Sequence, residues 1–570
     1  MTRPNLHRWP GFLRGLLLAF LVTFPAKAAP GGREAQAALF DGSRLLEIAI
    51  EIAPADWDKL RQEHQDLLAV LGPARLEKPP PEPYQTYRAD VTIDGVAVKG
   101  VGVRKRGFVG SSSFQRPSLG IKFDAFDSKG EFRGLERLAL NNNLQDPSEL
   151  HQVLAYHVFA RAGVPAPRCN LAHVTVNGRS LGIYTHVEAV EKAFLERHFT
   201  SAKGNLYEGR SSDFRPQWVN TFERKNHRSD TNRSDLAAVV AAFDADDLHL
   251  LERLSPLIDL DEYLSYWAVE SLIGDWDSYS NNGNNFFIYR HPHTEKFVFI
   301  PWGADAAFGD RDPFTTFETP ESVMARSVLP WRLYRLLDMR ERYRERLREV
   351  LRTAWNEREL LAEVDRLAAL IKGRTHGPSA QSRAGVFAVR EFIRTRRAAI
   401  EAELNGTAPE WTLPLRPSPV LEKVGTLSAE FSANWFTQRP LNPLGEGTAD
   451  FTLVLHGKKL RFARQGVYAA PAEDKRNAGH PTLGFVGLAP AGLRLAIPVF
   501  VIQPELFKPG AKVPIDGFCT GGILLQGALA GEGPRFAGFF IGTLELREAS
   551  REPGGKVTGR LSADLWQMPR

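Results

Sequence analysis

The chain contains few cysteines, and this scarcity excludes several kinds of protein. Its 570 residues include only two, Cys169 and Cys519. A disulfide-rich scaffold needs more of them, and a structural zinc site usually shows closely spaced Cys/His pairs, which are missing here. In an oxidising compartment the two thiols would form a single bridge between distant segments. Two unrelated buried thiols are an equally open alternative.

The chain also lacks a strong excess of charge of either sign. Its 72 basic and 67 acidic side chains leave a formal net charge of +5, too little for this length to predict a nucleic-acid partner. Apolar residues make up 43% and charged residues 24%, which is typical of a globular protein rather than a disordered one. The length exceeds that of one ordinary domain, so two or three domains are expected.

No apolar run is long enough to cross a bilayer, which takes about 20 residues. The run nearest the N-terminus, residues 15–24, follows several basic residues and precedes the small-residue segment Ala26-Lys27-Ala28. This pattern is typical of a secretory signal peptide, here residues 1–28, with an uncleaved anchor as the alternative. We therefore expect an exported protein, periplasmic or extracellular, that has no membrane span after cleavage.

Two hairpins and several long helices are predicted in the first two thirds of the chain. Asp94-Gly95 and Asn177-Gly178 each separate two segments of alternating apolar residues, the strongest short-range hairpin signal. Apolar residues recur at helical spacing in residues 150–162, 260–273, 338–356 and 383–404. Hairpins followed by helices favour an α+β fold over an alternating parallel sheet.

Residues 414–570 have a different texture and predict a separate all-β domain. Glycine and proline there separate short alternating segments, among them residues 426–431, 450–455, 495–502, 536–546 and 556–566. Regular short strands with turn signals between them are typical of a sandwich-like domain or a barrel. Its role is left open between binding a partner and shielding the first domain.

A basic strand that runs into a Gly/Ser loop is a candidate phosphate site. Glycine lets backbone amides approach an anion, serine adds hydroxyl donors and arginine adds charge. The residues concerned are Arg104, Arg106, Gly107, Ser111 and Ser112, followed on the next predicted strand by Lys122. A lysine on a strand beside such a loop is typical of phosphate positioning in kinases. A solvated hairpin end with a surface lysine is the alternative.

Two later segments are candidate metal sites. Residues 274–285 contain two aspartates and four asparagines, whose oxygens are the hard ligands that Mg²⁺ prefers. Asp277 and Asn282 stand five residues apart, the spacing of the base and a metal ligand in a protein-kinase catalytic loop. Asp305 follows a strongly apolar strand, where a buried carboxylate needs a cation or hydrogen-bond donors. Simple turns are the alternative for both segments.

Five collinear motifs resemble those of the spore-coat protein H (CotH) family. Arg104–Ser112 resembles its R-x-K/R-G-x-(x)-S-S signature, and Lys122 stands where that family has a strand lysine. The other matches are Val174–Glu188, Gly204–Tyr207, Asp277–Tyr289 and Ile300–Trp302. They run from about residue 40 to 310, and the helices up to about residue 405 complete an expected domain at 39–405.

The resemblance implies an atypical, reduced protein-kinase-like domain that uses ATP and Mg²⁺ or Mn²⁺ to phosphorylate serines of a partner protein. It implies that Lys122 binds the nucleotide phosphates and that Asp277 is the catalytic-loop aspartate. Asn285, and with it Asn282 and Asp305, would bind the metal. Glu188 would orient Lys122 through an ion pair and so contribute to nucleotide binding.

One position departs from the family pattern and keeps a second hypothesis open. Many relatives have aspartate after the Pro-Trp pair, whereas this chain has Gly303 and its nearest carboxylate is Asp305. If Asp305 cannot reach the metal, the protein is a pseudokinase that serves as a non-catalytic envelope or surface binding protein. A hydrolase is the third hypothesis, but neither a nucleophile elbow nor a zinc-binding helix supports it.

Overall fold

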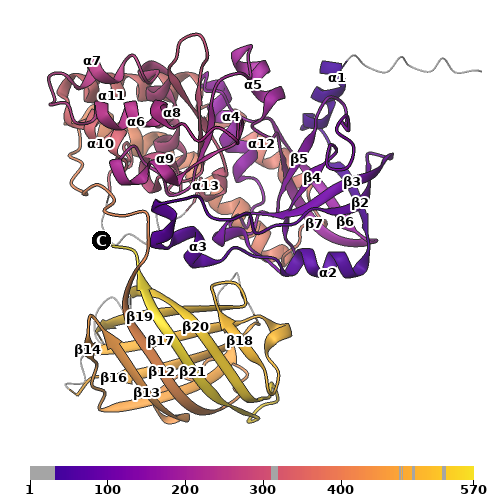
Figure 1. Cartoon of the computed structure of the whole chain (residues 1–570), viewed down its shortest axis with the longest axis vertical. Helices are drawn as coiled ribbons and strands as arrows, with labels where there is room; N and C mark the ends of the chain where they lie inside the picture. Colours follow the sequence, from indigo (N-terminus) through magenta and orange to yellow (C-terminus); the bar gives the residue numbers. More distant parts are fainter. Residues whose placement is uncertain are drawn as a thin grey trace, which may run out of the picture.

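The structure is a computed structural model that describes residues 32–309, 319–473, 477, 479–490, 494–528 and 535–569. The predicted signal peptide, residues 1–28, lies outside the described residues. Figure 1 shows a part that mixes helices with short strands, followed along the chain by a part built of strands. The α+β character predicted from the sequence is confirmed.

The first seven strands close into a barrel. They are β1 (Leu46–Ile52), β2 (Tyr87–Ile93), β3 (Val96–Arg106), β4 (Ser118–Lys122), β5 (Arg137–Asn141), β6 (Cys169–Val176) and β7 (Arg179–Val187). Their order is β1-β2-β3-β4-β5-β7-β6, and the parallel pairing of β6 with β1 closes the ring. Alternate apolar residues of each strand fill the interior.

Both predicted hairpins are confirmed, and their turn residues explain why. Asp94 and Gly95 connect β2 to β3 with φ values of 49° and 79°, and Asn177 and Gly178 connect β6 to β7 with φ values of 49° and 77°. A two-residue hairpin turn of this kind requires positive φ at both positions, which glycine, asparagine and aspartate tolerate best. The register of the barrel is therefore fixed locally at two of its corners.

A small second sheet and a set of helices complete the first part of the molecule. The sheet has the order β11-β10-β8-β9, with β8 at Leu206–Gly209, β9 at Phe222–Arg224, β10 at Phe286–Arg290 and β11 at Phe297–Pro301. The longer helices are α4 (His151–Arg161), α8 (Leu260–Ile273), α10 (Val328–Arg335), α11 (Leu337–Thr353), α12 (Glu357–Leu370) and α13 (Ser379–Asn405). The helix predicted at 260–273 is confirmed, and Trp267 within it stacks on Tyr343 of α11.

Shorter helices connect these elements. They are α1 (Gly32–Ala37), α2 (Pro54–Gln62), α3 (Leu67–Leu71), α5 (Lys192–Phe199), α6 (Ser234–Ala242), α7 (Leu250–Leu254) and α9 (Tyr279–Asn282), with short 3₁₀ turns that include η3 (Val109–Ser111) and η5 (Ala304–Ala306). None of the helices in the described ranges has both the length and the apolar content that crossing a bilayer requires.

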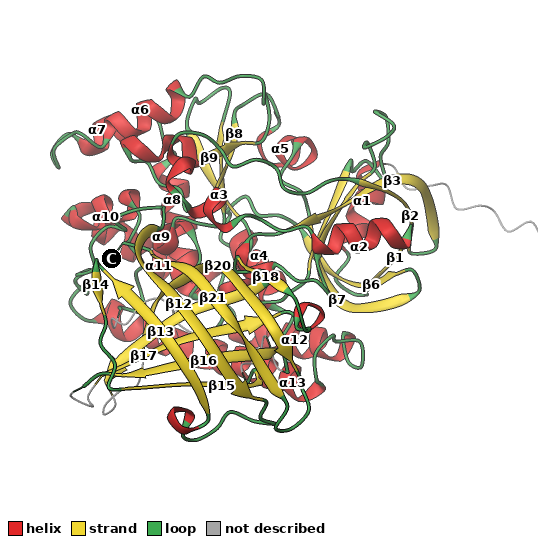
Figure 2. Cartoon of the chain, turned by 60° about the horizontal axis from the view of Figure 1, so that its bottom comes forward, coloured by secondary structure: helices red, strands yellow, loops and turns green. Residues whose placement is uncertain are grey.

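The C-terminal part is all-β, and its strands belong to one curled sheet. It contains β12 (Glu422–Asn434), β13 (Gly447–Leu455), β14 (Lys458–Lys459), β15 (Arg464–Pro471), β16 (Pro481–Leu488), β17 (Arg494–Ile502), β18 (Lys512–Ile515), β19 (Thr520–Ala528), β20 (Arg535–Ala549) and β21 (Lys556–Gln567). The path runs β14-β13-β12-β21-β20-β19-β17-β16-β15, and β18 pairs with β20. Its two ends meet where the Gln465 side chain of β15 bonds the backbone of Phe451 in β13. Figure 2 shows the two halves of this sheet as facing layers.

The C-terminal sheet packs against the first part through apolar contacts. Leu67 and Leu71 of α3 form a cluster with Leu421 and with side chains of β20 and β21. Phe114 belongs to the core of the C-terminal sheet, where its ring stacks on Phe518 with centroids 4.5 Å apart. The two cysteines, one in β6 and one beside β19, are free thiols. Of the two alternatives for Cys169 and Cys519, the structure therefore has the unbridged one.

Candidate functional site

A cleft of about 2240 Å³ contains nearly all the residues that the sequence singled out. Strands β3 and β4 of the barrel, the loop after α8, the β8–β9 strands and the ends of β20 and β21 in the C-terminal sheet line it. The predicted residues that line the cleft are Arg104, Arg106, Gly107, Ser111, Ser112, Lys122, Asp277, Asn282, Asn285 and Asp305. Residues as far apart in sequence as Arg104 and Asp305 thus face a common space.

The loop that carries Asp277 is fixed at both ends. Helix α8 stops at Gly274, whose φ of 64° is the left-handed conformation that ends many helices. The buried carboxylate of Glu270 then accepts hydrogen bonds from the backbone amides of Tyr279, at 3.1 Å, and Ser280, at 3.2 Å. These bonds anchor the first turn of α9, so the residues between the two helices have little freedom.

Three asparagine side chains surround the carboxylate of Asp277. The Nδ2 atom of Asn285 donates to Oδ2 at 2.9 Å, and that of Asn284 donates to both oxygens at 3.1 and 3.2 Å. Asn282 donates to Oδ1 as well. The spacing of Asp277 and Asn282 and the family resemblance of Asn285 singled out these residues, and the structure brings both asparagine amides into contact with the aspartate. The amides fix the orientation of a half-buried carboxylate that faces the cleft.

Asp305 lies in η5, directly after strand β11, and is only 5% exposed. The Nδ2 atom of Asn141 lies 3.4 Å from its Oδ2 atom. Burial raises the pKa of Asp305 to about 7, and the negative charges of Asp277 and Asp146 add to the shift. The carboxyl groups of Asp277 and Asp305 are thus close enough to repel each other.

A third carboxylate, Asp275, adds to this negative charge. It is buried, and its Oδ1 atom has no hydrogen-bond partner among the described residues. Burial and the charges of Glu270, Asp277 and Asp305 hold its pKa well above the ordinary value. Carboxylate and amide oxygens in a dry, negatively charged site are the donor set of a divalent hard cation. No three described carboxylates of this group have oxygens within 4.8 Å of one another, so metal binding would draw them together.

The backbone conformation of Gly303 and the side chain beside it explain why a glycine occupies this position. Its φ is 53°, and a Cβ atom built on it would lie 2.9 Å from Oδ1 of Asn285. The amide of Asn285 fills the space that a side chain at position 303 would occupy. A side chain at position 303 would therefore have to displace the asparagine amide that bonds Asp277.

The opposite wall of the cleft carries three cations on one face of the barrel. Arg104 and Arg106 of β3 stand opposite Gly120 and Ser118 of β4, so they share a face with Lys122. A Cβ atom on Gly120 would lie 2.9 Å from the side chain of Arg106. The absence of a side chain at position 120 lets the arginine lie across the neighbouring strand.

Two of these cations have no ion-pair partner. Arg104 pairs with Glu82 at 2.6 Å, whereas Arg106 and Lys122 form neither an ion pair nor a side-chain hydrogen bond with any described residue. The guanidinium of Arg106 instead lies 5.6 Å from the ring of Trp302. Burial lowers the pKa of Lys122, and the charge of Arg137 lowers it further. Positive charge without a direct ion-pair partner in a cleft is a binding determinant for an anion.

The Gly/Ser loop contains a turn that requires glycine at its start. Gly107 has a φ of 107°, and its carbonyl oxygen accepts a hydrogen bond from the Tyr84 hydroxyl at 2.9 Å. The Ser111 hydroxyl accepts from the Phe108 amide at 3.2 Å, which stabilises the turn of η3. Ser111 therefore shapes the loop, and both Ser111 and Ser112 line the cleft.

The predicted ion pair between Glu188 and Lys122 is not formed. Glu188 is buried outside the cleft lining, where Oε1 pairs with Arg168 at 2.6 Å and Oε2 pairs with Arg197. Hydrogen bonds and charges from these arginines outweigh burial and lower the pKa of the glutamate. Its position after β7 turns the side chain toward α5 and the segment before β6, so it stabilises the scaffold there.

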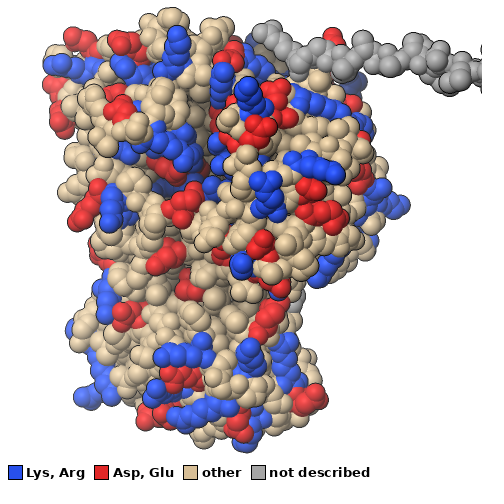
Figure 3. Space-filling model, turned by 45° about the vertical axis from the view of Figure 1, so that its right-hand side comes forward, with Lys and Arg blue, Asp and Glu red and all other residues tan. Residues whose placement is uncertain are grey.

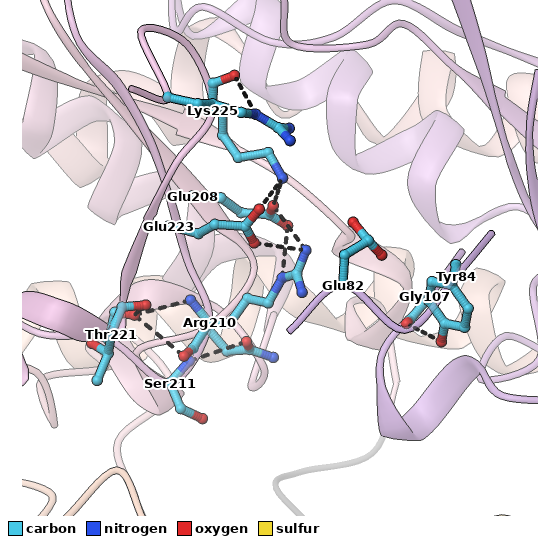
Figure 4. Close-up of polar contacts among 12 residues, drawn as sticks. Glu82, Tyr84, Gly107, Glu208, Arg210, Ser211, Thr221, Glu223 and Lys225 are labelled. Carbon is cyan, nitrogen blue, oxygen red and sulfur yellow. Dashed lines mark hydrogen bonds and ion pairs between the residues drawn. The ribbon is translucent and has the colours of Figure 1, made fainter. Parts of the chain in front are cut away.

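A network of four charged residues on β8 and β9 was missed in the sequence. Lys225 contacts Glu208 and Glu223 at 2.8 and 2.9 Å, and Arg210 contacts the same two carboxylates at 3.0 and 3.3 Å. Figure 4 shows the lysine and the arginine approaching the two glutamates from opposite sides. The alternation Glu208-x-Arg210 and Glu223-x-Lys225 places these charges on one face of each strand. That alternation is the signal that would have revealed the network.

His151 and Asp146, which were also missed in the sequence, form a chain of contacts to the backbone of Asp305. His151 contacts the backbone oxygen of Asp305 through Nδ1 at 2.9 Å and the Asp146 carboxylate through Nε2 at 3.3 Å. Asp146 also accepts the His151 amide at 2.7 Å, at the start of α4. The run of three asparagines at 141–143 after an apolar strand was the available sequence signal.

The comparisons with known proteins agree with the motifs in this cleft. The model of the family described as CotH kinase protein matches residues 103–400, which is just over half of the chain. The chain belongs to the CotH family. Every cleft residue predicted above lies within the matched region.

Individual relatives are distant and are matched over part of their length. The inner spore coat protein H of Bacillus subtilis is 26% identical over 208 residues, 34% of this chain and 56% of that protein. Spore coat protein homolog 1 of Rhizopus delemar is 24% identical over 180 residues, 29% of each chain. The chain therefore spans about half the length of the first relative and less of the second. The solved structure of the Helicobacter pylori proinflammatory kinase CtkA aligns with 50% of this chain and 94% of its own, at 12% identity and a TM-score of 0.27.

Proposed function

We propose that this CotH-family chain is an exported, atypical protein kinase that transfers the γ-phosphoryl group of ATP to a serine of a partner protein. The observation that carries the proposal is the pairing of opposite charges across one cleft. Arg106 and Lys122, which have no ion-pair partner among the described residues, line the same cleft as Asp277 and Asp305. The phosphates of a nucleoside triphosphate need the cations of the first wall, and an attacking hydroxyl needs the carboxylates of the second wall. In this proposal the first part of the molecule is a reduced protein-kinase-like fold.

The residues have separate roles in the proposed transfer. Lys122 and Arg106 bind phosphate oxygens, and the Gly107–Ser112 loop covers them. Asp277 orients the serine hydroxyl and accepts its proton, while the serine oxygen forms a bond to the γ-phosphorus. The bond from that phosphorus to the bridging oxygen of ADP breaks, and ADP leaves with the electron pair. Asparagine amides hold Asp277 in the orientation that this step needs.

Mg²⁺ or Mn²⁺ fits the oxygen donors of Asp305, Asn285 and Asn282. A bound divalent cation would neutralise charge on the phosphate oxygens. The raised pKa of Asp305, caused by burial and by neighbouring carboxylates, supports a requirement for positive charge at this wall. The Asn285 oxygen lies beside Gly303, so this asparagine is placed between Asp277 and the residue that departs from the family pattern.

The location and partner are part of the proposal. The names of the relatives associate them with spore coats, and a coat or surface association is what we propose for this chain. Export would depend on residues 1–28. The protein substrate would present serine acceptors at the open side of the cleft.

A pseudokinase that binds a partner without catalysis is the second candidate, and Gly303 is the observation that favours it. The glycine supplies no carboxylate where many relatives have one. In that case the cleft would bind an anionic ligand through Arg106 and Lys122, and the C-terminal sheet would contribute to the binding surface.

Phosphate transfer from labelled ATP to a serine-rich peptide, and to the chain itself, tests the proposal. Asp277→Asn removes the proton acceptor and is expected to lower incorporation by about 10²- to 10⁴-fold. Asp305→Asn is expected to abolish phosphate incorporation, and adding more Mg²⁺ or Mn²⁺ should not restore it. Asp338→Asn, an exposed aspartate on α11, is the matched control and is expected to retain activity.

Nucleotide binding is measured separately, as the shift of the thermal unfolding midpoint by ATP and metal. Lys122→Met removes a charge that forms no ion pair or hydrogen bond with any described residue, so it is expected to weaken ATP binding about 10- to 100-fold without loss of stability. Lys129→Met, an exposed lysine, is the control. Binding without labelling would favour the pseudokinase, and the loss of both would reject nucleotide chemistry altogether.

A further inference from the structure

Three potential metal ligands meet where the C-terminal sheet touches the first part of the molecule. His64 follows α2, and Asp516 and Cys519 lie in the turn between β18 and β19. The ligand atoms of the three side chains all lie within 4.8 Å of one another. In the part of the chain that the structure describes, no other three His, Cys, Asp or Glu side chains converge in this way.

The Nε2 atom of His64 faces a carboxylate oxygen. The Nδ1 atom of the same ring lies 3.0 Å from the backbone oxygen of Gln62, an acceptor, so Nδ1 must carry a proton. In the neutral ring Nε2 is then an acceptor, yet it lies 3.0 Å from Oδ2 of Asp516. Two acceptors at this distance require a proton or a metal cation between them.

The remaining contacts hold the ligands as supporting groups do in metal sites. Oδ1 of Asp516 accepts the backbone amides of Phe518 at 2.8 Å and Cys519 at 2.6 Å, which leaves Oδ2 for His64. The His64 ring stacks on Phe518 with centroids 4.4 Å apart. A hydrogen bond from the second ring nitrogen and a fixed carboxylate are the usual outer partners of metal ligands.

We propose that Nε2 of His64, Oδ2 of Asp516 and Sγ of Cys519 bind one Zn²⁺-class cation, which pins the C-terminal sheet to the first part of the molecule. Imidazole, carboxylate and thiolate together select a borderline-soft cation of tetrahedral preference. The thiol of Cys519 releases its proton to solvent on binding, so two negative ligands balance the charge of the cation. His64 and Asp516 are 29% and 19% exposed, which leaves room for a water as the fourth ligand.

The site is adjacent to the cations of the cleft. Lys105, between Arg104 and Arg106 on β3, points to the other side of the strand and lies 4.2 Å above the Phe518 ring. Its Nζ donates to the backbone oxygen of Arg61 at 2.8 Å. Fixing Phe518 therefore fixes the strand that presents Arg104 and Arg106.

Cobalt titration of the full chain tests the site without reference to catalysis. Co²⁺ bound by a thiolate gives an intense sulfur-to-metal charge-transfer absorption, which binding by surface histidines does not give. We expect this absorption to saturate at one Co²⁺ per chain and to disappear when Zn²⁺ is added. It should be lost in Cys519→Ser and unchanged in Cys169→Ser, the other cysteine of the chain.

A second ligand variant keeps the test valid if Cys519→Ser fails to fold. His64→Gln keeps the thiol and is expected to weaken Co²⁺ binding by at least about 10-fold, with an unfolding midpoint in EDTA close to that of wild type. Absence of the charge-transfer absorption in the folded wild-type chain would overturn the proposal. The same conclusion would follow if Cys519→Ser retained the absorption, or if His64→Gln bound Co²⁺ as tightly as wild type. In those cases His64 and Asp516 form a simple imidazolium–carboxylate pair.

Discussion

At the residue scale, Gly303 links backbone conformation to the candidate site. Its φ of 53° disfavours any side chain by about 1–2 kcal/mol, and a Cβ atom there would press on Oδ1 of Asn285 at 2.9 Å. Asn285 cannot move without losing its hydrogen bond to Asp277. We therefore predict that Gly303→Ala lowers the free energy of unfolding by about 1–2 kcal/mol and also reduces phosphate incorporation.

Gly373 supplies the matched control for this prediction. Its φ is 79°, and a Cβ atom built on it has no neighbour within 4 Å. Gly373→Ala should carry a similar backbone penalty, measured by urea unfolding, but leave incorporation unchanged. Equal losses of activity in the two variants would contradict a specific role for the contact with Asn285.

Glu149 makes a second residue-scale prediction, concerning pH. Burial raises its pKa to about 7 although Arg116 lies 3.4 Å away, whereas the unfolded chain titrates near the ordinary value of 4.5. Between these values the folded protein holds a proton that the unfolded chain has lost, so stability falls as pH rises through this window. The glutamine in Glu149→Gln cannot ionise. The free energy of unfolding of this variant should therefore rise relative to that of wild type by roughly 1 kcal/mol per pH unit between pH 5 and 7.

The measurement is the urea unfolding midpoint at several pH values. Glu252→Gln, at an exposed glutamate of α7, is the control and should follow the wild-type pH dependence. A Glu149→Gln curve parallel to wild type across the window would show that Glu149 does not hold the proton.

At the element scale, strand β4 has a glycine, Gly120, where the absence of a side chain leaves room for an arginine of the neighbouring strand. Gly120 stands opposite Arg104, and a Cβ atom on it would lie 2.9 Å from Cδ of Arg106. Any larger residue would displace the arginine from the face of the barrel. We predict that Gly120→Ala weakens ATP binding several-fold, while the barrel, whose backbone φ at this position is ordinary, stays folded.

Gly521 of β19 is a suitable comparison for Gly120. It also lies in a strand without a positive φ, and a Cβ atom there meets nothing within 4 Å. Gly521→Ala should leave the ATP-induced thermal shift at its wild-type size. If Gly120→Ala also leaves that shift unchanged, Arg106 does not contact the nucleotide.

At the scale of the whole molecule, Phe518 connects the two parts. It is 6% exposed, and its ring contacts His64, Lys105 and Phe114 of the first part. Truncating a buried phenylalanine typically costs about 3–5 kcal/mol. We predict that Phe518→Ala loosens the junction and makes the connecting segment 406–421 more sensitive to limited proteolysis.

Phe387 provides the control for the junction because its side chain is 61% exposed on α13. Phe387→Ala should show the wild-type pattern of fragments over the same digestion time. Equal protease sensitivity of Phe518→Ala and wild type would mean that the remaining contacts around Leu71 and Leu421 hold the two parts together alone.

Charged side chains of both signs are mixed on the surface of the molecule that Figure 3 displays. This mixing is in keeping with the small formal net charge. Arg106 and Lys122 line the cleft together with Asp277 and Asp305.

Features that depend on neighbours in the chain were determined by the sequence alone. The hairpin turns at Asp94-Gly95 and Asn177-Gly178 follow from backbone preferences of two residues. The helix at 260–273 follows from apolar periodicity and ends at a glycine. Contact between Asp277, Asn282 and Asn285 follows from their spacing within one short loop.

Features that join distant segments were decided only by the tertiary structure. Glu188 pairs with Arg168 and Arg197 rather than Lys122, because the closure of the barrel sets which side chains its face meets. The C-terminal strands form one curled sheet because strand order, which alternation does not encode, sets the architecture. His64 meets Cys519 only through docking of that sheet. Short-range preferences fix the elements, and the burial of their apolar faces against one another decides which polar side chains are left facing a common space.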